Sequence, residues 1–122
     1  MPALLLMCVA MSAHEAQARG IFVDGNELVK MMNAYERAER EGIDKVDSKA
    51  VFNAAWFMGY ISGVADETET PYFTTKKINA AQVAAVVAKF LKENPEKWSE
   101  PGNQIVTEAL KKAFPFPKSE VK

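Results

Sequence analysis

The stretch that decides the fold is Trp56-Phe-Met-Gly-Tyr-Ile-Ser-Gly-Val-Ala-Asp66, which is mostly apolar. Its apolar residues recur at helical spacing, and Asp47 or Ser48 upstream is a good N-cap, which predicts a helix from about residue 48 through Val64. Because apolar residues occur almost all round this helix, we expect it to be the buried central helix of the domain.

Two glycines, Gly59 and Gly63, lie four residues apart inside this predicted helix. Each glycine costs about 1 kcal/mol of helix propensity relative to alanine, but its missing Cβ allows a neighbour to approach the backbone. The Gly-x-x-x-Gly pattern indicates membrane dimerisation only within an apolar stretch of about twenty residues, and this stretch is shorter. We therefore expect Gly59 and Gly63 to permit tight packing within the chain.

A second helix is predicted from about Asn26 to Glu41, because Asp24 and Glu27 resemble a capping box, apolar residues follow at helical spacing, and Gly42 ends the pattern. A third begins at Asn79 and ends at Asn94-Pro95.

The last helix is predicted to be capped by Ser99, with Pro101 just inside it, and to end at residues 114–117, which read Phe-Pro-Phe-Pro. No segment has a convincing strand pattern. The expected fold is all-α, a compact bundle of four main helices.

The first eighteen residues resemble a secretory signal peptide. An apolar run from Ala3 to Ala13 is too short to span a bilayer, and residues 16–18 read Ala-Gln-Ala, a typical cleavage site. No Lys or Arg precedes the run, and the alternative is an apolar N-terminal helix that packs on the domain. We expect residues 1–18 to be a signal peptide, residues 19–122 to form one domain, and the protein to be periplasmic.

Cleavage after residue 18 would remove Cys8 and His14, the only cysteine and the only histidine of the chain. The mature domain could not form a Cys/His or Ser/His/Asp nucleophile or a usual zinc site, so we expect no metal and no cofactor. Loss of Glu15 leaves 15 acidic against 15 basic residues, which gives no electrostatic reason to bind nucleic acid or an anionic membrane. Carboxylate chemistry or protein binding remains.

Residues 66–77 form the longest predicted loop, and three carboxylates, Asp66, Glu67 and Glu69, lie in it. They could bind calcium or act as an acid/base pair, but they lack the Asp/Asn/Gly pattern of a calcium loop. A solvated acidic loop is the simpler interpretation.

Three motifs, in this order, resemble one family: MGYISGVAD (58–66), INAAQVAAVVAKFLKENPE (78–96) and IVTEALKKAFPF (105–116). Together they are similar to the Tai immunity proteins of type VI secretion, also called resistance-associated proteins. The similarity covers most of the chain from Leu28 to Phe116.

The chain departs from this family at four cysteine positions, which Met32, Phe57, Phe73 and Phe116 occupy here. A disulfide contributes about 2–4 kcal/mol, and a buried Met or Phe side chain about 1.5–3 kcal/mol, so apolar pairs could replace the bridges. We expect Met32 to contact Phe57, and Phe73 to contact Phe116. Thr74-Thr75 also replaces a family Leu-Pro.

The resemblance implies a periplasmic protein, not an enzyme, that binds a type VI effector, commonly a peptidoglycan amidase, and fills its cleft. Family members are often homodimers. The contact residues that we expect lie in the loop and at a second, less favoured site: Glu67, Glu69, Tyr72, Lys76 and Lys77, then Lys97, Trp98 and Glu100. Alternatively, Tyr72 and Trp98 only cover the ends of the bundle, and we expect Trp56 and Tyr60 to be aromatics at the edge of the core.

Three other interpretations stay open. A periplasmic stress or chaperone-like binding protein would expose a sizeable apolar patch and have no dedicated effector. An enzyme would require Asp66, Glu67 or Glu69 to converge in a cleft with perturbed pKa values. The domain could also have kept the fold and lost the inhibitory task.

Overall fold

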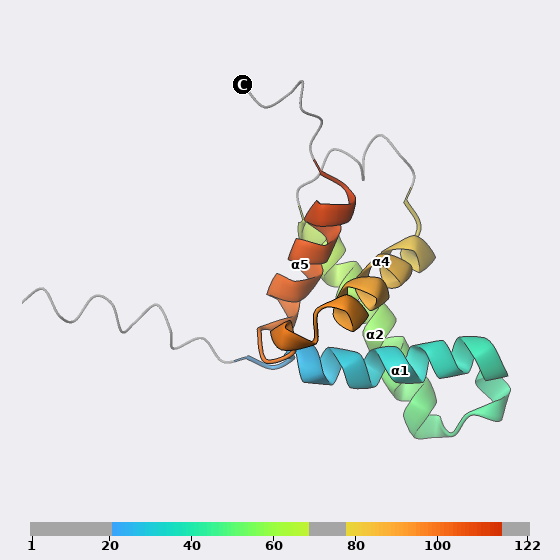
Figure 1. The fold of residues 1–122 in the computed structure, drawn as a ribbon. Coiled ribbons are helices and arrows are strands. Elements are labelled where there is room, and N and C mark those ends of the chain that lie inside the picture. The colour runs from blue at the N-terminus through green and yellow to red at the C-terminus, as the bar shows by residue number, and fades with distance from the viewer. Residues whose placement is uncertain (1–20, 69–77, 116–122) are drawn as a thin grey trace, which may run out of the picture.

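The computed structural model describes residues 21–68 and 78–115, and every regular element in these two ranges is helical (Figure 1). The only extended pairing among these residues is an isolated antiparallel bridge between Asp24 and Pro101. The prediction of an all-α fold with four main helices is therefore confirmed. The elements in chain order are α1 (Gly25–Glu41), the 3₁₀ turn η2 (Ile43–Lys45), α2 (Ser48–Glu67), α4 (Ala80–Glu93), the 3₁₀ turn η3 (Pro95–Lys97) and α5 (Gly102–Ala113).

Side-chain caps set the starts of three helices. The carboxylate of Asp24 accepts from the backbone N–H of Glu27 at 2.9 Å, and that of Asp47 accepts from the N–H of Ala50 at 2.8 Å. At α4, the side chain of Asn79 and the backbone of Gln82 form one half of a capping box, and the reverse pair forms the other. Each cap satisfies an N–H that has no partner within its helix.

The prediction that Ser99 caps the last helix is wrong. Pro101 is the N-cap residue of α5, and it makes no side-chain capping bond. The chain before α5 is instead paired with the start of α1, since Gly25 N–H donates to Glu100 O at 3.0 Å and Gly102 N–H donates to Val23 O at 2.8 Å. Ser99 itself lies in a turn, and this pairing at Glu100 and Gly102 makes the helix begin only at Gly102.

The hydrophobic core lies where all four helices meet. In Figure 1, α2 passes behind α4, and it packs against α1, α4 and α5. Each helix turns one apolar stripe inward, as its 3.6-residue periodicity predicts. The largest fully buried side chains are Phe57, Leu28, Met31, Ile61, Leu91, Ile105, Leu110, Val87 and Val106.

α2 is central, as predicted, since it packs against α1, α4 and α5, but the prediction that it is a buried helix holds for only one of its faces. Its buried residues, Ala50, Ala54, Phe57 and Ile61, form a single face. On the opposite face Phe52 is 63% exposed and Trp56 is 44% exposed, so Trp56 is not at the edge of the core. In the described part of the chain, α1, α4 and α5 all pack on one side of α2, which leaves its other side uncovered.

No helix in the described ranges is both long enough and apolar enough to cross a membrane.

Candidate functional site

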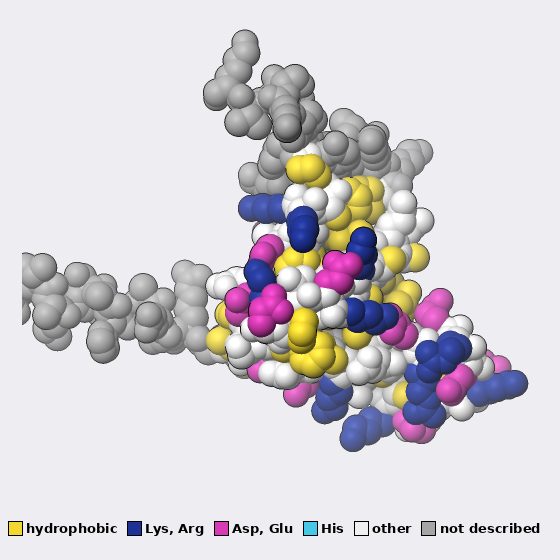
Figure 2. Space-filling view, in the orientation of Figure 1, with side chains coloured by type: hydrophobic (Ala, Val, Ile, Leu, Met, Phe, Trp, Pro, Cys, Tyr) yellow, Lys and Arg dark blue, Asp and Glu magenta, His cyan; other side chains and the backbone are white. Residues whose placement is uncertain are grey.

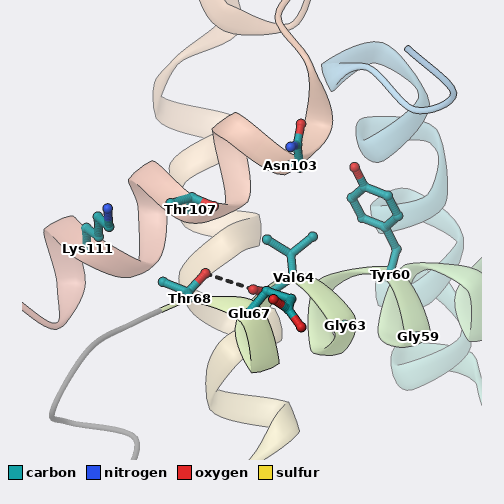
Figure 3. Close-up of a pocket in the computed structure, with 9 residues that line it drawn as sticks. All are labelled: Gly59, Tyr60, Gly63, Val64, Glu67, Thr68, Asn103, Thr107 and Lys111. Carbon is teal, nitrogen blue, oxygen red and sulfur yellow. Dashed lines mark hydrogen bonds between the residues drawn. The ribbon is translucent and has the colours of Figure 1, made fainter. Parts of the chain in front are cut away.

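A groove runs between α2 and α5, with a volume of about 650 Å³ (Figure 3). Residues of α2 line one side of the groove, and residues of α5 line the other side. The residues that line it are Gly59, Tyr60, Gly63, Val64, Glu67 and Thr68 from α2 and Asn103, Thr107 and Lys111 from α5. Its mixed polar and apolar lining suits a protein or peptide surface.

Gly59 and Gly63 form the α2 side of this groove, and the prediction that they permit tight packing is wrong. A Cβ built on either glycine meets no atom within 4 Å in the described part of the chain. Both glycines are exposed, because the packed face of α2 is the opposite one, around Phe57 and Ile61. Backbone is therefore accessible on this part of α2.

Tyr60 stands at one end of the groove, near the start of α5 (Figure 3). It is half-buried, and burial raises the pKa of its hydroxyl above the ordinary value, while a hydrogen bond with the Asn103 backbone lowers it. At the other end, the Thr68 hydroxyl donates to Val64 O at 2.8 Å and closes the last turn of α2. Both ends of the groove are thus held by hydrogen bonds.

The exposed face of α2 continues beyond the groove as a row of two aromatic and two small residues. Phe52 and Trp56 pack edge to face, with ring centroids 5.7 Å apart and planes at 68°. Gly59 and Gly63 follow them at helical spacing. We call Phe52, Trp56, Gly59 and Gly63 the α2 stripe.

The predicted contact loop lies mostly outside the described residues. Glu67 is exposed on the last turn of α2 and lines the groove. Glu69, Tyr72, Lys76 and Lys77 are among the residues that the structure does not describe. Their role in binding stays a prediction.

The second predicted contact site, Lys97, Trp98 and Glu100, has clear structural roles. Lys97 Nζ lies 2.5 Å from Glu108 Oε1, and this hydrogen bond raises the pKa of Lys97. Trp98 is half-buried against the core, and its indole N–H donates to Leu91 O at 2.8 Å. The contacts of Trp98 are those expected of a residue that covers an end of the bundle. Binding of a partner at this second site stays a prediction.

The carboxylates considered for catalysis do not form a cluster in the described residues. Asp66 and Glu67 are both exposed, and Glu69 lies outside the described residues. Within residues 21–68 and 78–115 there is no group of three or more His, Cys, Asp and Glu side chains that could hold a metal ion.

Charges of both signs are interspersed on the face shown in Figure 2. Among the described residues, Lys92 pairs with Glu36 and Arg37 pairs with Glu41. This face therefore presents no broad field of one sign that would attract a polyanion.

Comparison with known proteins gives one result. The family model of the Rap1a immunity proteins matches residues 24–116 of the chain. This range includes all four helices, the groove and the α2 stripe.

The chain belongs to the Rap1a immunity protein family. No curated protein and no solved structure matches it. Membership of the Rap1a family indicates an immunity protein that binds a secreted effector as a non-catalytic inhibitor.

Two of the four cysteine positions can be placed in this Rap1a protein. Met32 is 2% exposed and Phe57 is fully buried, and both belong to the one core cluster, where α1 packs on α2. Burial of both is what the replacement of a bridge by apolar packing requires, and their direct contact stays a prediction. Phe73 and Phe116 lie outside the described residues.

Most of the groove was not predicted from the sequence, although the sequence contains a signal for it. Gly59, Gly63 and Glu67 are spaced by four residues, and so are Asn103, Thr107 and Lys111. Residues four apart share one face of a helix, so both rows could have been recognised as continuous surfaces that are not core. What the pattern did not contain was the pairing of the two helices.

Proposed function

We propose that this Rap1a-family protein is a periplasmic immunity protein of a type VI secretion system. Its partner would be an effector, a peptidoglycan amidase, that reaches the periplasm of the producing cell or of its siblings. The observation that carries the proposal is the family match over residues 24–116. The signal-peptide pattern of residues 1–18 supports export to the compartment where such an effector acts.

The proposed mechanism is occlusion of the effector's substrate cleft. A stable interface of standard size needs ~800 Å² from each partner, which one loop and one helix face can supply. The segment after Thr68, with Glu69, Tyr72, Lys76 and Lys77, would enter the cleft, and the groove beside Glu67 would hold the cleft's rim. We further propose that the protein acts as a homodimer.

Co-expression with the effector tests this function. A candidate amidase encoded beside this gene is directed to the periplasm with or without the full chain, and lysis is followed by optical density. We expect rescue from lysis together with a co-purified complex. Continued lysis without a complex would contradict the proposal.

Two variants test the location and the contact residues. Deletion of residues 2–18 should abolish protection without preventing complex formation between the purified proteins, because binding does not depend on export. Tyr72→Ala should weaken the complex, since an aromatic anchor is a typical hot spot worth about 2 kcal/mol or more. Ile43→Ala, at an exposed apolar side chain on η2, is the matched control and should bind like the wild type. Equal affinity of the Tyr72 variant would place the contact elsewhere.

A further inference from the structure

The exposed face of α2 has an ordered pattern of charge and size. Along the helix it presents a positive residue, two large aromatics, two glycines and a negative residue, all of them exposed. The pattern is symmetric about the point between Phe57 and Met58. The positive residue and the negative residue are equally far from this point, and so are the two members of each aromatic–glycine pair. The six residues are Lys49, Phe52, Trp56, Gly59, Gly63 and Asp66.

The same six residues have the spacing of a coiled-coil seam. They follow one another at intervals of three, four, three, four and three residues. Such alternation keeps side chains on one line along a helix that faces a second helix. In the described part of the chain α1, α4 and α5 pack on the opposite face of α2, so this seam has no partner there.

We infer that the α2 stripe is a homodimer interface in which α2 packs antiparallel against α2 of a second copy. A twofold axis at the midpoint places Phe52 of one copy opposite Gly63 of the other, and Trp56 opposite Gly59. Lys49 then lies opposite Asp66. The surface is complementary to itself, as a closed twofold dimer requires.

Size complementarity favours this occupant. Among the described residues, a Cβ at Gly59 or Gly63 would meet no atom within 4 Å, so an aromatic ring of the second copy could approach the backbone there. The groove of about 650 Å³ beside these glycines continues the space available to the rings. Phe and Trp each bury about 150–250 Å², and exposing them as a pair is unfavourable unless a partner covers them.

Charge complementarity selects the antiparallel direction. In a parallel pair Lys49 would face Lys49 and Asp66 would face Asp66, and like charges would repel. In the antiparallel pair both ends of the seam bring opposite charges together. The charge pattern therefore fixes the relative direction of the two helices.

This inference specifies the homodimer named in the proposed function, and its test uses no effector, so failure of either proposal can be distinguished. The full chain is expressed, recovered from cells with its native N-terminus, and studied by sedimentation equilibrium over a range of concentrations. We expect a reversible dimer. A protein that stays monomeric at its highest soluble concentration would overturn the inference.

Filling the glycine positions tests the interface. Gly59→Leu with Gly63→Leu should raise the dimer Kd by about tenfold or more, because two leucines occupy the space of the rings. Ala85→Leu, at an exposed position of α4, is the matched control and should leave the Kd unchanged. Circular dichroism melting of dilute protein verifies that the variants fold. A wild-type Kd in the glycine variant would place the interface elsewhere and overturn the inference.

A charge swap tests the direction of packing. Lys49→Glu or Asp66→Lys alone should raise the Kd several-fold, since each creates two repulsive pairs per dimer, and the double variant should restore it. An unchanged Kd in both single variants would show that residues 49 and 66 do not face each other, as in a parallel pair, and would overturn the antiparallel arrangement. If the wild type is monomeric and the glycine variant no longer protects cells from the effector, the effector covers the α2 stripe instead of a second copy.

Discussion

Two pairs of glycines in this protein lie in opposite environments, one in close contact with other backbone and one beside open space. Gly25 and Gly102 are the first residues of α1 and α5, and both are buried where the chain before α5 crosses the chain before α1. Gly59 and Gly63 lie in the middle of α2 with open space beside them in the described structure. The comparison teaches that a glycine can be required by a close contact within the fold, or can keep a surface open for something outside it.

The strongest way to test the first half of this comparison is Gly25→Ala. The new Cβ would overlap the Cα of Trp98 and lie 2.6 Å from its carbonyl oxygen, and both belong to backbone that cannot move aside without breaking the bonds of the crossing. We expect a loss of about 3 kcal/mol in the free energy of unfolding, measured by urea titration. A loss below about 0.5 kcal/mol would show that the crossing adapts.

Gly102→Ala should have a smaller effect of the same sign. Its Cβ would lie 2.9 Å from Val23 O and 3.0 Å from the Tyr60 hydroxyl, so the Val23 backbone, which accepts from Gly102 N–H, would have to move, but by less than Trp98 would for Gly25→Ala. We expect a loss of about 1–2 kcal/mol by the same titration. A loss equal to that of Gly25→Ala would mean that a Cβ at either glycine disrupts the whole crossing to the same extent.

The helices themselves could be predicted because their signals are local. Asp24, Asp47 and Asn79 cap helices in the sequence and in the structure, since a cap depends only on residues three positions away. Ser99 did not act as a cap, because the backbone on either side of it pairs with residues 23–26, more than seventy positions earlier. Local patterns carry no information about such a crossing.

The candidate site was harder to predict than the fold for a related reason. The glycines at 59 and 63 are visible in the sequence, but whether they face a neighbouring helix or solvent depends on where α1, α4 and α5 pack. An apolar fraction spread all round α2 suggested burial, whereas Phe52 and Trp56 are exposed. An exposed apolar face cannot be told from a buried one by periodicity alone.

The second half of the comparison predicts a gain in stability. Gly59→Ala and Gly63→Ala should each raise the free energy of unfolding by about 0.5–1 kcal/mol, because alanine favours the helix and its Cβ meets no atom of residues 21–68 and 78–115 within 4 Å. Stability is again measured by urea unfolding. The protein is kept dilute so that dimer formation does not contribute to the measured stability. A loss of stability in either variant would show that the fold itself uses these glycines.

The smallest effect is expected at Tyr60, the residue that contacts both regions, since its hydroxyl lies by Gly102 and its side chain lines the groove beside Gly59 and Gly63. Burial raises its pKa in the folded protein, so between about pH 10 and that raised pKa the unfolded chain ionises while the folded one keeps its proton. The stability that depends on the protonated phenol is complete below about pH 10 and is lost as the pH rises through the folded pKa.

Tyr60→Phe should therefore lose less stability than the wild type between pH 9 and pH 11 in urea unfolding. Contributions from Tyr35 and Lys97, whose pKa values are also raised, are present in both proteins and cancel in the difference. Parallel pH profiles would mean that the Tyr60 hydroxyl is as well solvated in the fold as in the unfolded chain.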